Sequence, residues 1–236
     1  MSRLYCHNPD TMPMRGGTRT PADEIVGKAA SFTPFIPAAG GATVSGGEPR
    51  LQPVFAGELL HRFRHELGLH TALDTSGFLG SRAHDALVAD TDLVLLDIKS
   101  WEPALYRELT GRELRPALDL ARRLETLGKE VRVRFAVVPG LTDGEADVEG
   151  VAAFAGGLPN VTRVDALPFH KPGAGTYEAL GKRFPAAATP SPDPQVMDRV
   201  RAQLRAHGLH TVRPSPHGPA EAGMRGGTHL RTVPIG

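Results

Sequence analysis

The stretch DLVLLDIK, residues 92–99, decides the fold. It is an apolar run with little alternation, which is typical of a strand that is covered on both faces in a parallel sheet. Four further runs end in a short polar or glycine-rich cluster, so each predicts a strand that leads into a loop. These runs are ATVSGGEP from Ala42, LHTALDTSG from Leu69, VRVRFAVVPG from Val131, whose FAVV part also lacks alternation, and VTRVDALPFH from Val161.

Segments with helical spacing lie between these strands and after the last of them. Each places its apolar side chains on one face, namely Leu59, Leu60, Phe63 and Leu67, then Leu120, Leu124 and Leu127, and finally Val196, Val200 and Leu204. In the last helix Asp193 can cap the start and Pro194 fits the first helical position, while Gly128 and Gly208 suit the ends of two helices. Because parallel strands need a crossover connection, the alternation predicts an α/β fold with a parallel sheet and helices packed outside it.

Composition limits the classes of function. The chain has 236 residues, of which 40% are hydrophobic, and its 27 Lys and Arg side chains nearly balance 26 Asp and Glu. With no basic stripe interleaved with aromatic residues, we expect no nucleic-acid partner. No apolar run approaches the roughly 18 residues of a membrane span, and a single cysteine cannot form an internal disulfide. We therefore expect a cytoplasmic protein without a membrane partner.

The two ends of the chain depart from the alternating pattern. Residues before Thr20 contain no strand pattern, and residues 213–236 are rich in Pro and Gly without periodicity. We therefore expect one domain over residues 1–212, followed by a disordered tail over residues 213–236.

Polar clusters follow the predicted strands, at the carboxyl ends where parallel α/β sheets carry their reacting groups. In the first cluster, Gly46 and Gly47 let the backbone approach a ligand and Glu48 adds a carboxylate, which suits a ligand with an ammonium group. A plain tight turn explains the same residues without a ligand. His170 ends the last strand, where it either lines a pocket or has an ordinary packing and hydrogen-bonding role.

Asp74, Thr75 and Asp97 end two strands that are neighbours if the sheet follows chain order. Two carboxylates close together are unfavourable unless a cation or a proton lies between them. A hard monovalent or divalent cation is therefore one interpretation of the cluster. The other interpretation is that Lys99 or backbone amides satisfy the two aspartates.

His61 and His65 have the i, i+4 spacing of a metal clamp. An arginine stands where the HExxH motif has its glutamate, and both histidines lie away from the apolar face of their helix. We therefore interpret them as a solvated surface pair.

Six blocks in chain order resemble the radical S-adenosylmethionine (SAM) activases of glycyl-radical enzymes, the family of pyruvate formate-lyase activating enzyme. The blocks are RLYCHNPDTM, GGATVSGGEPRLQ, HTALDTSGF, DLVLLDIK, RFAVVPGLTD and LPFHKPGAGTYEALG. The similarity runs from about Arg3 to Val212, which is nearly everything except the tail. The resemblance implies a partial (β/α)6 TIM-like barrel that holds a [4Fe-4S] cluster and SAM at the carboxyl ends of its strands. It also implies reductive cleavage of SAM to a 5′-deoxyadenosyl radical, which takes a hydrogen atom from a glycine of a partner enzyme.

The resemblance also assigns roles to residues of this chain. The residues that it places around SAM are Gly46, Gly47 and Glu48 at the methionine ammonium, Lys99, Arg134 and His170 nearby, Tyr5 near the adenine, and Asn8 in the same loop. Asp74, Thr75 and Asp97 match a cation site, which suggests a monovalent ion. The implied partners are a glycyl-radical enzyme such as pyruvate formate-lyase and an electron donor such as flavodoxin.

The cluster motif of the family is Cys-x-x-x-Cys-x-aromatic-Cys, and Cys6 matches its last thiolate. Arg3 stands at the position of the middle cysteine, and the first cysteine would precede residue 1. Arginine has no lone pair to offer iron. We therefore expect the chain as given to lack a competent cluster. We also expect it to lack the first strand of the barrel, which leaves the backbone from Thr43 to Ser45 unpaired.

Three functions remain open at this point. The first is the activase, of which this chain records a shortened or mis-started version. The second is a non-catalytic protein of the same fold that binds SAM or a glycyl-radical enzyme. The third is a metal-dependent lyase or hydrolase that uses Asp74 and Asp97. The six blocks favour the activase as the family of the chain, and the single cysteine favours inactivity of the chain as given.

Overall fold

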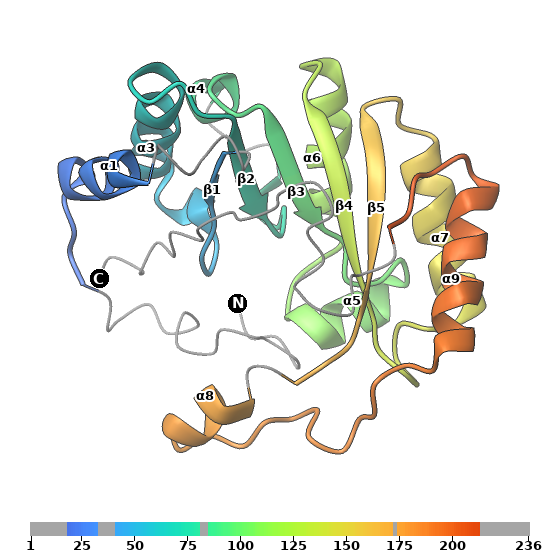
Figure 1. Ribbon diagram of the computed structural model, residues 1–236. Helices are drawn as coiled ribbons and strands as arrows, with labels where there is room; N and C mark the ends of the chain where they lie inside the picture. The colour runs from blue at the N-terminus through green and yellow to red at the C-terminus, as the bar shows by residue number, and fades with distance from the viewer. Residues whose placement is uncertain (1–17, 33–40, 81–84, 172–173, 213–236) are drawn as a thin grey trace.

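The computed structural model describes residues 18–32, 41–80, 85–171 and 174–212. At its centre is a sheet of five parallel strands that follow one another in chain order (Figure 1). The strands are β1 (Ala42–Val44), β2 (Thr71–Thr75), β3 (Leu93–Asp97), β4 (Glu130–Val137) and β5 (Val161–Pro168). The five predicted strands are confirmed, and with them the α/β fold with a parallel sheet. Within the described residues β1 pairs with β2 alone, so it forms an edge.

Helices connect successive strands and pack outside the sheet (Figure 1). These connecting helices are η3 (Pro49–Leu51), α3 (Pro53–His65), α4 (Asp85–Ala89), α5 (Pro103–Thr110), α6 (Arg115–Thr126) and α7 (Glu145–Gly156). Helix α1 (Ala22–Ser31) precedes β1, and helices α8 (Ala174–Ala179) and α9 (Pro194–Ala206) follow β5. A strand followed by a helix that returns the chain to the start of a neighbouring parallel strand is the repeating unit of a β/α barrel. The arrangement agrees with the predicted partial barrel.

One face of the sheet carries the apolar core. In β4 the side chains of Val131, Val133 and Phe135 are fully buried, and they form one cluster with apolar residues of α6, α7 and α9. The residues that alternate with them, which include Arg132 and Arg134, are only partly buried. The second face of β4 therefore carries charged side chains in the part of the strand before the FAVV stretch. Within FAVV, the expectation of burial on both faces is confirmed for Phe135, Val137 and Val138, and Ala136 is partly buried. The same expectation is confirmed for β3, where only the central residue is not fully buried.

The opposite face of the sheet is charged. Asp97 of β3 and Asp165 of β5 are the register partners of Arg134 in β4. Side chains of register partners point to the same face of a sheet, so these three charges share one face. Arg163 adds a fourth charge, because its Nε lies 2.7 Å from Oδ1 of Asp165. The charged face is the inner face of the partial barrel, and the apolar face that packs against the helices is its outer face.

The end of α6 differs from the prediction. Leu120 and Leu124 are buried as expected, but Leu127 follows the last helical residue and is 42% exposed. Leu127 is the residue at which the helix ends, and Gly128 after it has a φ of +62°, which turns the chain toward β4. The assignment of Leu127 to the buried face is therefore wrong.

The start of α9 agrees with the prediction in part. Pro194 occupies the first turn as expected, and Asp193 is the residue before the helix. The Asp193 side chain, however, makes no capping hydrogen bond. Its backbone carbonyl instead accepts the hydrogen bond from the N–H of Met197, at 3.1 Å.

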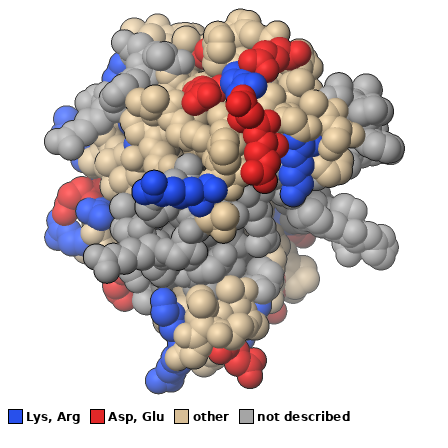
Figure 2. All heavy atoms as spheres, turned by 90° about the vertical axis from the view of Figure 1, so that its left-hand side faces the viewer, with Lys and Arg blue, Asp and Glu red and all other residues tan. Residues whose placement is uncertain are grey.

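The face that carries α1 and α3 shows acidic and basic side chains next to one another (Figure 2). Arg62 of α3 is an example, since its guanidinium lies 2.6 Å from Asp23 of α1 and 2.8 Å from Glu66. The pair with Asp23 connects α1 to α3, and the pair with Glu66 is local to the end of α3. Among the described helices, none combines the length and the apolar character that crossing a bilayer requires.

Candidate functional site at the strand ends

Glu48 joins the loop after β1 to the end of β2. It precedes η3, and only 6% of the residue is exposed. Its Oε1 accepts a hydrogen bond from the Thr75 hydroxyl at 2.6 Å, and its Oε2 accepts from the hydroxyl and the backbone N–H of Ser76 at 2.6 and 3.0 Å. The N–H of Arg50 also points at Oε1, at 3.4 Å. A carboxylate offers about four acceptor positions, so this one is saturated by donors of the protein.

The turn after β2 holds this end of the sheet against α6. Gly77 has a φ of +71°, in the region that favours glycine. A Cβ atom at this position would lie 2.9 Å from the Cα of Ala117 in α6. The N–H of Gly77 donates to the Thr75 hydroxyl at 3.1 Å. The Thr75 hydroxyl is thereby fixed toward Glu48.

Arg134 bridges the two aspartates at the ends of β2 and β3. Its Nη2 lies 2.5 Å from Oδ1 of Asp74, and its Nε lies 3.1 Å from Oδ1 of Asp97. Lys99 Nζ is 2.9 Å from Oδ2 of Asp97, and the Ser45 hydroxyl donates to Oδ2 of Asp74 at 2.8 Å. Both carboxylates thus contact the same guanidinium group. The interpretation that Lys99 satisfies an aspartate is confirmed for Asp97, and Arg134 is a bridge that the sequence did not indicate.

The electrostatics of this bridge explain its stability. Burial alone would lower the pKa of Arg134, but the charges of Asp74 and Asp97 and their hydrogen bonds raise that pKa above its ordinary value. The guanidinium therefore stays charged at every pH at which a protein folds. Because the Asp97 side chain is only 5% exposed, a permanent counter-charge removes the penalty of a lone buried carboxylate.

The glycines of the first cluster differ from the glutamate beside them. Gly46 and Gly47 are exposed, whereas Glu48 is buried. Without a Cβ atom, the backbone amide and carbonyl groups of the two glycines are accessible to a ligand. The loop thus presents its backbone outward while Glu48 anchors it to Thr75 and Ser76.

His170 follows β5 at the same edge of the sheet, and it is exposed. The N–H of the preceding residue, Phe169, donates to the carbonyl of Val137 at 3.0 Å. This hydrogen bond keeps the ends of β4 and β5 together. The network of Glu48 and Arg134 is built from the ends of β1 to β4, and His170 stands beside it at the end of β5.

Several predicted features lie outside the described residues. They are Tyr5, Cys6 and Asn8, together with Arg3 and the tail over residues 213–236. Their assignments stay predictions.

Sequence reasoning missed a buried arginine beside Glu48. Arg50 is 4% exposed, and its Nη2 donates to the carbonyl of Gly80 at 2.5 Å. Its Nε and Nη1 are buried without a hydrogen-bond partner in the described part of the chain. Burial lowers the pKa of Arg50, and the nearby charge of Glu48 counteracts this. A lone arginine after GGEP gives no sequence signal of such burial.

The charged inner face was also missed, although a signal for it existed. In VRVRFAV and VTRVDALP, the charged residues alternate with apolar residues in the period-2 pattern of a half-polar strand. Arg132, Arg163 and Asp165 follow from that pattern as residues of a polar face.

Comparison with known proteins relates the chain to one superfamily. The family model of the radical SAM superfamily matches residues 4–154. The chain is 40% identical to the pyruvate formate-lyase-activating enzyme of Clostridium pasteurianum over 177 residues, which cover 75% of this chain and 74% of that protein. It is 32% identical to pyruvate formate-lyase 1-activating enzyme of Escherichia coli K12 over 213 residues, which cover 88% and 85% of the two chains.

Solved structures share the fold. A domain of pyruvate-formate lyase-activating enzyme from Bacteroides vulgatus has a TM-score of 0.62 and 24% identity, covering 73% of this chain and 98% of that chain. Streptococcus suis SuiB bound to its precursor peptide SuiA has a TM-score of 0.68 and 14% identity, covering 92% and 46%. At these identities the two structures bear on the fold alone.

The fold and the matched family model define a radical SAM protein. Within that superfamily, the extent and identity of the matches show that the chain belongs to the family of pyruvate formate-lyase-activating enzymes.

Proposed function

We propose that this chain is an activase that generates a glycyl radical on a partner enzyme of the pyruvate formate-lyase type by reductive cleavage of SAM. The observation that carries the proposal is the network of polar groups at the ends of β1 to β4. A family relationship of 40% identity supports the same function, since the relative is named for it. We further propose a flavodoxin-type electron donor and a cytoplasmic setting.

The amino-acid part of SAM fits the exposed loop after β1. Gly46 and Gly47 offer backbone groups to its ammonium, and Glu48 positions that loop through Thr75 and Ser76. The Glu48 carboxylate already accepts hydrogen bonds from the protein at all its positions. This supports the interpretation that the ammonium contacts the glycine backbone and not Glu48.

Cationic side chains lie at the neighbouring strand ends. Lys99 and Arg134 fit the carboxylate of SAM, and we place His170 at the rim of the same site. Tyr5 and Asn8 complete the proposed set near the adenine.

A monovalent cation at Asp74, Thr75 and Asp97 is a second part of the proposal. Its support is the meeting of two carboxylates at one edge of the sheet. In the structure Arg134 supplies the positive charge between them. An ion at this place would therefore require the guanidinium to leave at least one of the two aspartates.

The cluster is the part of the family chemistry that the residues of this chain do not fit. A [4Fe-4S] cluster is held by several cysteine thiolates, and Cys6 is the only cysteine of the chain. Arg3 occupies the position that the resemblance gives to another ligand, and it cannot bind iron. This observation favours a second candidate function, a protein of the same fold that binds SAM or a glycyl-radical enzyme without radical chemistry.

The test is anaerobic reconstitution with iron and sulfide, followed by SAM, reductant and a purified pyruvate formate-lyase. For the chain as given we expect far less than one cluster per molecule and no 5′-deoxyadenosine. A matched variant combines Arg3→Cys with an N-terminal extension that supplies the remaining cysteine. For this variant we expect a full cluster, SAM cleavage and the electron paramagnetic resonance signal of a glycyl radical on the partner. A full cluster without SAM cleavage would overturn the activase and favour the second candidate.

A further inference from the structure

We propose that His61, His65 and Asp90 form a surface binding site for one divalent transition-metal ion, with Zn²⁺ as its best match. The two histidines lie in the last turns of α3, which ends at His65, and Asp90 follows α4. Both helices lead into the starts of β2 and β3. The cluster therefore lies at the edge of the sheet opposite the strand ends, and the proposal is independent of the activase.

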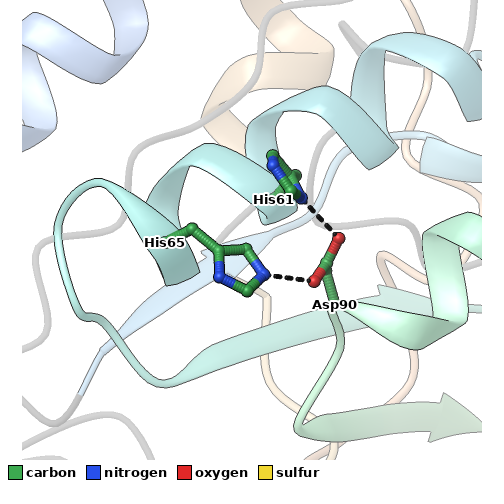
Figure 3. A group of neighbouring side chains, drawn as sticks. All are labelled: His61, His65 and Asp90. Carbon is green, nitrogen blue, oxygen red and sulfur yellow. Dashed lines mark hydrogen bonds and ion pairs between the residues drawn. The ribbon is translucent and has the colours of Figure 1, made fainter.

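The geometry of the three side chains supports a common ligand. Nδ1 of His61 lies 2.9 Å from Oδ2 of Asp90, and Nε2 of His65 lies 2.8 Å from Oδ1 (Figure 3). The possible ligand atoms of the three residues all lie within 4.8 Å of one another. An i, i+4 spacing places both imidazoles on one side of α3, with ring centroids 4.5 Å apart.

The backbone around Asp90 holds its carboxylate in this position. The Asp90 carbonyl accepts a hydrogen bond from the Thr71 hydroxyl at 2.6 Å. The carbonyls on either side of it, those of Ala89 and Thr91, each accept from Lys129 Nζ at 3.0 Å. Asp90 is thus fixed from both sides. The side chain is 19% exposed, whereas the His61 and His65 side chains are 60% and 53% exposed.

The chemistry of the donors points to zinc or a similar ion. Imidazole nitrogen and carboxylate oxygen bind Zn²⁺ at about 2.0–2.2 Å, and three protein ligands leave a fourth position to water. Tetrahedral coordination at that length separates ligand atoms by about 3.3 Å. The observed N–O separations of 2.8 and 2.9 Å involve the two different oxygens of Asp90, and the ligand atoms lie within 4.8 Å of one another. A metal that replaces the two bridging protons must therefore draw the two imidazole nitrogens together. Both histidine side chains are more than half exposed, so they are free to rotate toward a common ion.

The charged neighbours of the cluster already have partners. Arg64 of α3 forms an ion pair with Asp92, and Arg62 forms ion pairs with Asp23 and Glu66. These guanidinium groups therefore do not compete for Asp90. The sequence indicated only a solvated pair of histidines because the third group comes from another element, 25 residues beyond His65.

The experiment is calorimetric titration of the full chain, free of any histidine tag, with Zn²⁺ alone. We expect one ion per chain for the wild type. His65→Gln and Asp90→Asn should each weaken binding at least tenfold, while the matched control His210→Ala, an exposed histidine elsewhere, binds as the wild type does. Equal affinity of wild type and Asp90→Asn, or absence of saturable binding, would overturn the proposal.

A second measurement excludes the thiol and misfolded variants as explanations. Co²⁺ bound at this site should give visible d–d bands without a thiolate charge-transfer band, and Cys6→Ser should leave the spectrum unchanged. Zn²⁺ should raise the Tm of the wild type and of Cys6→Ser but not that of Asp90→Asn. Loss of the Co²⁺ spectrum in Cys6→Ser would assign the metal to the thiol and contradict the site on α3.

Discussion

The two ends of β2 and β3 carry similar groups in different environments. At their carboxyl ends, the Asp97 side chain is 5% exposed, and its counter-charges are Arg134 and Lys99. At their amino ends, Asp90 faces two histidines that are more than half exposed. Where a carboxylate is buried, a permanent cation is needed, because a lone buried charge is strongly destabilising. Where water reaches the carboxylate, as at Asp90, neutral or metal-binding partners such as histidines are sufficient to satisfy it.

Removal of the buried cation should have the largest effect. Arg134→Met leaves Asp74 and Asp97 without their bridge, so we expect the free energy of unfolding to fall by about 3–4 kcal/mol. Urea denaturation at equilibrium measures the change. The control is Arg132→Met in the same strand, whose guanidinium pairs with Glu130, and there we expect about 1 kcal/mol or less. Similar losses for the two variants would mean that the bridge contributes nothing beyond a surface ion pair.

The two ends of β2 should also differ in their tolerance of a side chain at glycine. Gly77→Ala at the carboxyl end combines a left-handed backbone with a contact of 2.9 Å to the Ala117 backbone, so we expect a loss of about 3 kcal/mol. Gly68→Ala, just before the amino end, has a φ of +64° but open space around it, so we expect about 1–2 kcal/mol. Thermal and urea unfolding of both variants check the difference. A Gly68→Ala loss as large as that of Gly77→Ala would contradict the close packing of the carboxyl end.

Glu48→Gln tests the anchor of the first loop. The amide places an N–H group opposite hydrogen-bond donors of Thr75 or Ser76, and we expect a loss of about 2 kcal/mol in the free energy of unfolding. Glu130→Gln, on the half-exposed side chain of another glutamate in the same sheet, is the matched control with about 0.5 kcal/mol. A loss at Glu48 no larger than at Glu130 would show that the carboxylate does not anchor the loop.

Asp92, just before β3, makes the stability at the amino ends of β2 and β3 depend on pH. Burial alone would raise its pKa, but hydrogen bonds from the Thr71 backbone, Arg64 and the Thr71 hydroxyl lower the pKa below its ordinary value. Since the folded pKa lies below the unfolded one, the stabilisation is present above pH about 4 and is lost as the pH falls through the folded pKa.

We therefore expect Asp92→Asn to be about 1 kcal/mol less stable than the wild type at pH 7. The difference should shrink toward zero as the pH falls through the lowered pKa of the folded state. Urea unfolding from pH 2 to 8, without added metal, measures both. A constant difference over this range would contradict the lowered pKa.

The smallest effect is expected at the exposed histidines. Without metal, His65→Gln removes one solvent-accessible hydrogen bond with Asp90, so the free energy of unfolding should change by about 0.5 kcal/mol or less. Urea unfolding in the presence of a chelator measures it. A loss comparable to that of Arg134→Met would mean that the cluster of His61, His65 and Asp90 has a structural role.

Much of the fold could be predicted from the sequence, because apolar runs and helical spacing report burial directly. The run at residues 92–99 and the turn glycine after α6, Gly128, are examples. The prediction failed for Leu127, and the charged second face of β4 was missed. In both cases the local pattern reports which residues are apolar. It does not report where a helix ends or which face of a strand remains open to polar groups, because both depend on tertiary packing.

The site could be predicted as a set of residues but not as a set of contacts. The sequence placed Glu48, Asp74 and Asp97 at neighbouring strand ends, and the structure agrees. It did not show that Thr75 and Ser76 occupy the acceptor positions of the Glu48 carboxylate, nor that Arg134 bridges the aspartates. Such pairings join residues 27 to 60 positions apart, and a single sequence contains no information on side-chain direction at that separation.

Titration of the full chain with SAM tests the central claim most directly. We predict saturable binding of one SAM per chain, weakened about tenfold in Glu48→Gln and unchanged in His65→Gln, with circular dichroism to show that both variants are folded. No binding of SAM by the folded wild type, or equal affinity of the wild type and Glu48→Gln, would contradict the assignment of the strand ends to this ligand.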